Sequence, residues 1–333
     1  MSAQPLTLKQ IDAPGRYPGI PNAFYHGHLT KVPALGSSGA VKLMQTCPAT
    51  FWQESILNPD YEPEHKSAFD IGTAAHLAML EPDLWNERVV VVPFDDYRTS
   101  AAKAARDDAY SKGKTPLKPQ EARQIAAMRA ALVAHPLAGN AFTQGVAEST
   151  YVWIDDDTGC WCKARPDYLR REPFMLIDFK SSGSANPREF ARRAWDLGYF
   201  QQAAWYLEGV GRVEGEIPTE FWFVVQEVDP PHLVTVNKLP DRWIEYGAMM
   251  NAKARDTFAE CLRTSRWPGY RPNGIDRDVA FTLEMPTWAE FEIERRKEFG
   301  EFSRAKRITA EQAAIADRFH RPLSWDQPEE VKS

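Results

Sequence analysis

The stretch KARPDYLRREPFMLIDFK, residues 163–180, holds two largely apolar segments joined by a polar connection. Its first part ends the segment CWCKARPDYL, residues 160–169, and its last part is the apolar run PFMLIDFK. Both parts have the composition of buried β-strands, and the intervening RREP supplies a proline suited to a turn. The pattern predicts a β-hairpin that brings Asp167 beside Asp178.

The second strand of this hairpin has a charged face. Alternation of side chains along a strand places Asp178 and Lys180 on one side, with Ile177 and Phe179 on the other. The simplest interpretation is a core strand whose terminal polar groups face water. If the hairpin forms, however, Asp167 joins the charged face. Two neighbouring carboxylates repel, so they need a compensating cation, which is either a lysine or a metal ion.

Carboxylate oxygens are ligands that Mg²⁺ prefers. This ion keeps several waters and takes one or two protein carboxylates together with substrate phosphate. A lysine beside such an ion can orient water, assist its deprotonation or stabilise charge on a phosphate under attack. The acidic pair with its lysine is therefore typical of phosphodiester hydrolysis.

Four short motifs occur in a fixed order along the chain. They are G-x-x-x-H at 72–76, RPD at 165–167, DFK at 178–180 and Q-x-x-x-Y at 202–206. As an ordered set they resemble the PD-(D/E)XK nuclease superfamily, in its RecB-like branch. The segments FDIGTAAHLAMLEP and GYFQQAAWYLEG are most similar to the phage exodeoxyribonuclease VIII type. The resemblance spans about residues 37–270.

The resemblance implies an α/β (α+β) fold with a restriction-endonuclease-like core, in which helices flank a central mixed β-sheet. It also implies hydrolysis with two metal ions. Asp178 would bridge both ions, and Asp167 with the carbonyl of Phe179 would complete one site. His76 would contact the other ion, although a histidine in a buried helix is more often a hydrogen-bonded core residue. Lys180 would position the attacking water.

Three further side chains are candidates for the site. Gln202 and Tyr206 lie four residues apart and so share one helix face, and the resemblance implies that they brace the lysine or the phosphate. Ordinary packing of an amphipathic helix explains their spacing as well. Tyr199, at the start of the same helix, is interpreted as structural. Glu148 is a further candidate metal ligand or hydrogen-bond acceptor, because its strand is expected beside Asp167.

The net charge of −6 argues against strong nonspecific binding to nucleic acid, which depends on Lys and Arg. A basic groove can still exist on an acidic protein. Cations are dense near the motifs, and Arg165 is a candidate DNA contact. Ser37 and Ser38 precede a predicted helix, where they either cap the helix or hold a terminal 5′-phosphate.

The chain is expected to have three parts. Residues 1–36 are rich in Pro and Gly and predict an irregular segment, 37–270 form the nuclease domain, and 271–333 form a helical C-terminal extension. Within the domain, 97–120 is expected to be a mobile loop that either contacts DNA or only covers the surface. Periodicity predicts helices at about 37–56, 66–81, 119–134, 187–209 and 240–263, and strands at about 88–93, 147–154, 160–169, 174–180 and 219–228.

Length and composition favour an intracellular enzyme, and the resemblance implies the cytoplasm of a bacterial or phage-infected cell. No apolar run approaches ~20 residues, and the N-terminus lacks the pattern of a secretion signal. The four cysteines are expected to be free thiols. Some RecB-like relatives hold an iron–sulfur cluster with one early and three late cysteines. This sequence has no late group, so no cluster is expected.

By resemblance, the expected activity is Mg²⁺-dependent degradation of double-stranded DNA from its 5′ ends, with Mn²⁺ able to replace Mg²⁺. A single-strand annealing protein is the expected partner in recombination, and a homo-oligomeric ring is the expected assembly. Helices in 286–320 would support self-association. Two alternatives stay open, namely an endonuclease or single-strand-specific nuclease with the same chemistry, and a noncatalytic DNA-binding subunit.

Overall fold

The computed structural model describes residues 9–62, 67–271 and 280–301. The chain divides into two compact units, Met1–Tyr270 and Arg271–Ser333. Within these described ranges, no helix combines the length and the apolar character that crossing a membrane requires.

The elements of the first unit alternate between strand and helix. The strands are β1 (Gly15–Tyr17), β2 (Ala34–Gly36), β3 (Val89–Val91), β4 (Thr115–Leu117), β5 (Gly145–Ala147), β6 (Thr150–Ile154), β7 (Trp161–Ala164), β8 (Tyr168–Arg170), β9 (Met175–Ser182), β10 (Glu220–Glu227) and β11 (Val234–Lys238). The helices are α1 (Asn22–His26), α2 (Ser37–Gln45), α3 (Pro48–Gln53), α4 (Ser67–Leu80), α5 (Trp85–Arg88), α6 (Ser100–Ser111), α7 (Pro119–Ala134), α8 (Pro187–Asp196), α9 (Tyr199–Glu214) and α10 (Asp241–Thr264). Short 3-10 helices are η1 (Pro82–Leu84) and η2 (Ala138–Asn140).

The central sheet is mixed and has the strand order β11-β10-β9-β8-β5. β9 runs parallel to β10 and antiparallel to β8. The β8–β9 pairing confirms the predicted hairpin, and its register matches Tyr168 with Ile177. One step further along this register, Asp167 comes opposite Asp178.

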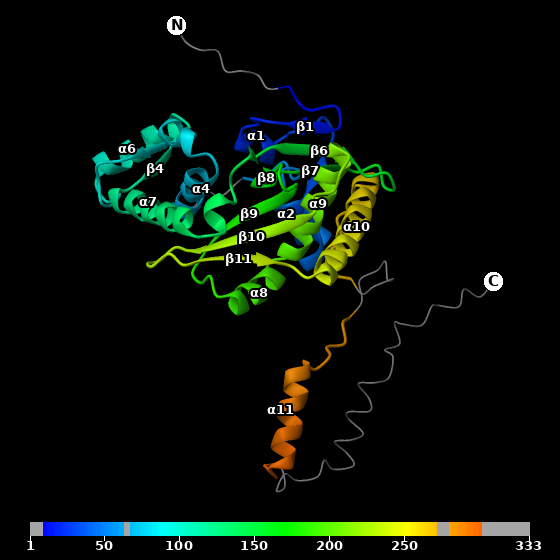
Figure 1. The fold of residues 1–333 in the computed structure, drawn as a ribbon. Helices are drawn as coiled ribbons and strands as arrows, with labels where there is room; N and C mark the ends of the chain where they lie inside the picture. Colours follow the sequence, from blue (N-terminus) through cyan, green and yellow to red (C-terminus); the bar gives the residue numbers. More distant parts are fainter. Residues whose placement is uncertain (1–8, 63–66, 272–279, 302–333) are drawn as a thin grey trace, which may run out of the picture. The chain divides into compact units, whose positions relative to one another are not determined.

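Helices cover both faces of this sheet (Figure 1). Leu176 packs in a core with residues of α8, α9 and α10, such as Phe190 and Trp205. Ile177 and Phe179 pack on the opposite face with residues of α4 and α7. This arrangement confirms the predicted mixed sheet flanked by helices, and it leaves Asp178 and Lys180 on the α8–α9 side of β9.

A second sheet, with the order β1-β6-β7-β2, packs against α9. The rings of Trp153 and Trp205 lie 5.4 Å apart at this contact. The sequence predicts little regular structure in residues 1–36, whereas the structure places β1, α1 and β2 there. These strands have three residues each and pair only along the edges of the sheet, so their sequences carry almost no periodic signal.

Three predicted elements are interrupted in the structure. The helix predicted at 37–56 divides into α2 and α3, because Pro48 starts a new helix at its first position. The strand predicted at 160–169 divides into β7 and β8, separated by residues 165–167, where Pro166 has no N–H to donate. The strand predicted at 147–154 divides into β5 and β6 around Glu148.

The expectation of a loop at 97–120 is wrong. This segment contains α6, whose N-cap Thr99 accepts a hydrogen bond from the backbone N–H of Ala102 (3.2 Å), followed by β4. β4 pairs in parallel with β3. The many charged residues suggest a solvated loop, but the buried Ala102 and Ala109 give the helix a packed face.

The second unit contains α11 (Thr287–Glu298) in its described part. Ion pairs three residues apart, such as Arg295 with Glu292 at 2.7 Å, stabilise its surface. Trp288 and Phe291 are 74% and 73% exposed. The rest of the helices expected in 286–320 lies beyond residue 301, outside the described residues.

Candidate active site

The end of the β8–β9 hairpin gathers the two acids and the lysine. Asp167 lies just before β8, and its Oδ2 accepts a hydrogen bond from the backbone N–H of Phe179 (2.7 Å). Asp178 is buried within β9, and its Oδ2 lies 2.6 Å from Nζ of Lys180. The structure therefore brings together the three residues that the sequence singles out.

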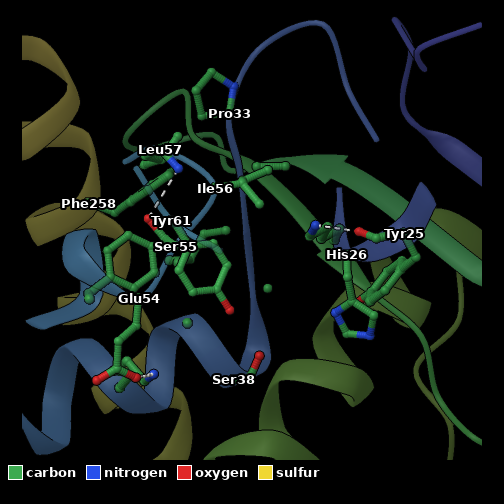
Figure 2. Close-up of a pocket in the computed structure, with 17 residues that line it drawn as sticks. Tyr25, His26, Pro33, Ser38, Glu54, Ser55, Ile56, Leu57, Tyr61 and Phe258 are labelled. Carbon is green, nitrogen blue, oxygen red and sulfur yellow. Dashed lines mark hydrogen bonds and ion pairs between the residues drawn. The ribbon is translucent and has the colours of Figure 1, made fainter. Parts of the chain in front are cut away.

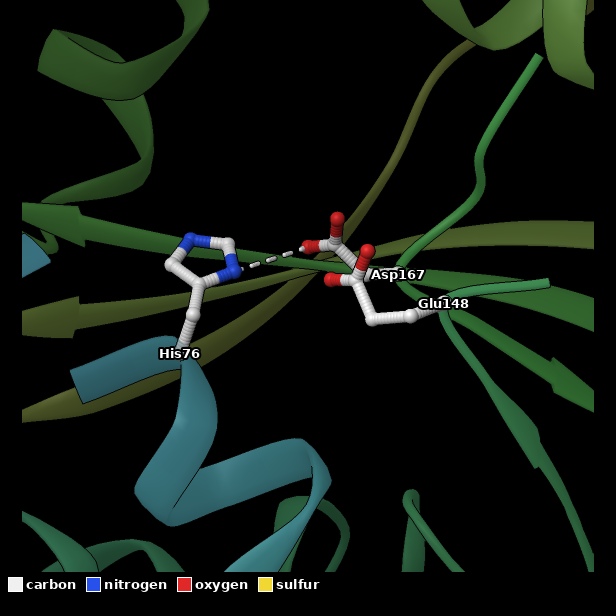
Figure 3. Close-up of side chains that lie close together, drawn as sticks. All are labelled: His76, Glu148 and Asp167. Atoms are coloured by element: carbon white, nitrogen blue, oxygen red, sulfur yellow. Dashed lines mark ion pairs between the residues drawn. The ribbon is translucent and has the colours of Figure 1, made fainter. Parts of the chain in front are cut away.

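Two residues from other elements complete an acidic cluster. His76 projects from α4, and its Nδ1 lies 3.6 Å from Oδ2 of Asp167. Glu148 follows β5. His76, Glu148 and Asp167 each present one ligand atom, and these atoms all lie within 4.8 Å of one another. Figure 3 shows the imidazole facing both carboxyl groups.

Glu148 owes its position to an uncommon backbone conformation. Its φ of 50° lies in the left-handed region, which a glutamate rarely adopts. Its N–H donates to the carbonyl of Asp167 at 3.0 Å, which fixes the two residues side by side. Strain of this kind persists where the surrounding structure enforces it, often at functional sites.

The carboxyl groups of the cluster resist ionisation. Burial and the neighbouring Asp167 raise the pKa of Asp178 to about 6. Burial, again with Asp167 beside it, raises the pKa of Glu148 to about 8. Burial also raises the pKa of Asp167. Such acids become fully ionised when a strong positive charge lies among them.

The two nitrogen bases differ in charge at neutral pH. Burial opposes the charged form of Lys180, but Asp178 and Asp167 outweigh it and raise the pKa of the lysine, which stays protonated. Burial and the charge of Lys180 lower the pKa of His76 to about 4. His76 is therefore neutral and has a lone pair available to a metal ion.

The donor set fits a hard divalent cation. Neither buried oxygen of Asp178 accepts a hydrogen bond of good geometry, although Oδ2 is ion-paired with Lys180. Buried polar atoms of this kind are otherwise hydrogen-bonded or metal-bound. Carboxylate oxygens with one neutral imidazole suit Mg²⁺ or Mn²⁺. Phe179 touches the cluster through its N–H, and the ligand role of its carbonyl stays a prediction.

Gln202 and Tyr206 lie close to each other on α9. Nε2 of Gln202 donates to the hydroxyl of Tyr206 at 3.2 Å. Burial, with smaller contributions from Tyr25 and Asp178, raises the pKa of Tyr206 well above its usual value. Within the described residues, the pair makes no hydrogen bond to Lys180, and its bracing of the lysine or of the phosphate stays a prediction.

Tyr199, interpreted from the sequence as structural, lies beside the lysine of the cluster. The centre of its ring lies 4.6 Å from Nζ of Lys180. The signal that could have revealed it is its position, since Gly198 and Tyr199 open the helix that carries the Q-x-x-x-Y motif.

One cavity borders the cluster, and a second lies at the start of α2. One, of about 420 Å³, is lined by His76, Glu148 and Arg165 among others. The other, of about 410 Å³, is lined by Ser38 and Lys163 among others (Figure 2). Each cavity is thus lined by one of the candidate DNA contacts, Arg165 in the first and Ser38 in the second. The third candidate, the serine at position 37, is buried and does not line either cavity.

The ring of Tyr25 contacts one cation from the lining of each cavity. Its ring centre is 4.9 Å from Nζ of Lys163 and 4.2 Å from the guanidinium carbon of Arg165. Arg165 also donates to Oγ1 of Thr150 and to the carbonyl of Ile20. Burial and the charge of Arg165 lower the pKa of Lys163 to about 8.

Comparison with known proteins finds a family whose model matches this chain and a solved structure with a similar fold. Residues 37–274 match the model of the family described as "PDDEXK-like domain of unknown function (DUF3799)". No curated protein matches the sequence. The crystal structure of a candidate exonuclease from Eubacterium rectale superposes with a TM-score of 0.52 at 15% identity, over 75% of this chain and 91% of that one. This likeness shows the fold alone.

A second solved structure, that of SSO0001, is 12% identical over 68% of this chain and 78% of that one. Its TM-score of 0.29 is too low to support an argument.

Proposed function

This chain belongs to the PDDEXK-like family that its residues 37–274 match, and from this premise we propose that it is a metal-dependent deoxyribonuclease. The observation that carries the proposal is the convergence of Asp167, Asp178 and Lys180 at one hairpin end, with His76 and Glu148 beside them. Intact acids and lysine argue against the alternative of a noncatalytic DNA-binding subunit.

The residues of the cluster have separate roles in this proposal. Two Mg²⁺ ions, or Mn²⁺ in their place, would be held by Asp167, Asp178, His76 and Glu148, and would supply the positive charge that activates water and stabilises the phosphate. Lys180 keeps its proton and donates a hydrogen bond that orients the attacking water or neutralises charge on the phosphate. Gln202 and Tyr206 support the site from α9.

The proposed substrate is double-stranded DNA, degraded from its 5′ ends to leave 3′ overhangs. Two cavities support this proposal, because one borders the acidic cluster, the other borders the start of α2, and Tyr25 contacts a cation of each. Free N–H groups at a helix start attract phosphate, and Ser38 lies there. In this proposal, the terminal phosphate of a strand enters the second cavity while an inner phosphate lies at the acids.

We expect a linear duplex with different labels on its 5′ and 3′ ends to lose the 5′ labels first. Released 5′-labelled products should be short, and the 3′-labelled strands should persist as overhangs. A closed circular duplex is the control and should resist digestion. Cutting of the circle would indicate an endonuclease, and a preference for unpaired strands would indicate a single-strand-specific enzyme. Binding of DNA without any product would indicate the noncatalytic alternative.

Activity should depend on Mg²⁺ or Mn²⁺ and be absent with Ca²⁺. Calcium takes more ligands at longer distances and does not enforce octahedral geometry, so it should hold DNA at the acids without promoting cleavage. The measurement is cleavage and DNA binding of one protein preparation in each ion and in excess chelator. Full activity in chelator would contradict a metal-dependent mechanism.

Recombination partners and assembly belong to the same proposal. We propose that a single-strand annealing protein receives the 3′ overhang and that subunits form a closed ring around the duplex. The exposed Trp288 and Phe291 of α11 are consistent with a surface used in self-association.

A further inference from the structure

An aromatic pair covers the ammonium group of Lys180. Nζ lies 4.6 Å from the ring centre of Tyr199 and 6.0 Å from that of Phe223. The two rings stack on each other, with centres 5.7 Å apart and planes inclined by 23°. Tyr199 therefore presents the nearer of the two ring faces to the charge.

The chain fixes Tyr199 in this place. Gly198 precedes it with a φ of 67° and forms the turn between α8 and α9. A Cβ at Gly198 would lie 2.8 Å from Cγ1 of Val41, so other residues are disfavoured there by crowding as well as by conformation. The ring of Tyr199 also packs against Phe190, with centres 6.0 Å apart.

Lys180 has few other constraints. Within the residues that the structure describes, its ammonium is ion-paired with Asp178 and makes no hydrogen bond of good geometry. A lysine has a long flexible stem and a compact charge that can point in many directions. An aromatic face attracts such a charge, most strongly where water is excluded. The side chain of Lys180 is only 17% exposed.

We propose that Tyr199 is a positioning residue that holds the ammonium of Lys180 against Asp178 in its working orientation. The inference rests on the proposed nuclease function for its kinetic consequence. Its geometric content stands apart from that function. The hydroxyl of Tyr199 makes no hydrogen bond within the described residues, so the ring face is the part of the side chain that acts.

Nuclear magnetic resonance tests the geometry without any enzymatic assay. The ε-methylene signal of Lys180, labelled with carbon-13 and assigned by its loss in Lys180→Ala, should be shifted upfield by the ring current of Tyr199. Tyr199→Phe should keep this shift, and Tyr199→Leu should remove most of it. A Lys180 signal at the ordinary lysine position in the unmodified protein would overturn the proposal, whether or not the variants fold.

Kinetics tests the consequence. Tyr199→Leu should lower kcat about tenfold with little change in KM, because the lysine acts on charge that develops during reaction. Tyr199→Phe should stay within about twofold of the unmodified enzyme, since it keeps the ring face. Phe221→Leu is the matched control, because it loosens the packing around Phe223, with ring centres 4.9 Å apart, without removing a contact of Tyr199 or Lys180.

The outcomes separate the inference from the proposed function. If the unmodified protein cleaves no DNA in Mg²⁺, the nuclease proposal fails, whereas the upfield signal still reports the position of the lysine. If Tyr199→Leu folds, loses the upfield signal and keeps full kcat, Tyr199 does not position Lys180 for reaction. An equal loss of kcat in Phe221→Leu would also overturn the proposal, since general loosening would then explain the effect.

Discussion

Replacing Lys180 with alanine is expected to reduce DNA cleavage by on the order of 10²–10³-fold or more. The ammonium is the protein's own cation beside Asp178, at 2.6 Å, and its raised pKa keeps it charged throughout the working pH range. It acts on charge that appears at the phosphate during reaction. DNA binding measured in Ca²⁺ should therefore change little. The measurement is kcat on end-labelled duplex in Mg²⁺.

Two further variants sharpen this prediction. Lys238→Ala removes another lysine from the same sheet, one whose ion pair with Glu220 lies at the surface, and should leave cleavage unchanged. Lys180→Arg keeps the charge but not the shape, and should stay strongly impaired, because a planar guanidinium does not fit the ring-lined position. Turnover near that of the unmodified protein in Lys180→Ala would remove the basis of the site assignment.

Lys180→Ala should also lower stability in chelator. It leaves the buried Asp178 without its cation, and an uncompensated buried charge is costly. Added Mg²⁺ should recover part of the loss, because an ion among the acids replaces the missing charge. The melting temperatures with and without Mg²⁺ measure this recovery.

The hairpin was predictable because its signal is local. Alternation in β9 fixes which side chains share a face, and the antiparallel register follows from the short connection. Asp167, Asp178 and Lys180 could therefore be placed together from eighteen consecutive residues. His76 could be added only through its motif, since nothing local indicates that α4 reaches the hairpin end.

The remaining parts depend on tertiary contacts. The segment 97–120 reads as a loop from its charges, yet a few buried alanines suffice to dock it as α6. The side chain of Glu148 is directed by a left-handed backbone that no residue pattern announces. Tyr199 reads as an ordinary first residue of a helix, and its significance appears only when β9 places Lys180 beneath the ring.

Two buried aspartates provide a matched pair for the last prediction. Asp178 and Asp155 are 1% and 3% exposed. Asp155 has no part in the proposed chemistry and serves the structure instead. Its Oδ1 is 2.8 Å from Nε of Arg255, and its Oδ2 accepts hydrogen bonds from Thr158. The change of aspartate to asparagine removes one charge at each position and keeps the size of the side chain.

Asp178→Asn should abolish cleavage, by on the order of 10³-fold, and weaken Mg²⁺ binding at least about tenfold by calorimetry. Its free energy of unfolding in chelator should change by less than about 1 kcal/mol, because two effects oppose each other. The neutral amide ends the repulsion from Asp167 that helps raise the pKa of Asp178 to about 6, and it also removes the partner of Lys180.

Asp155→Asn should show the reverse. Removing the charge that faces Arg255 should cost about 1.5–3 kcal/mol of stability, while Mg²⁺ affinity and kcat stay close to those of the unmodified protein. The opposite outcomes distinguish the effect of removing a buried charge from the loss of a group that takes part in the reaction. Both carboxylates are buried, and only Asp178 lies beside Lys180. Cleavage retained in Asp178→Asn, or lost in a folded Asp155→Asn, would show that the acids of the hairpin are not where the phosphodiester bond is broken.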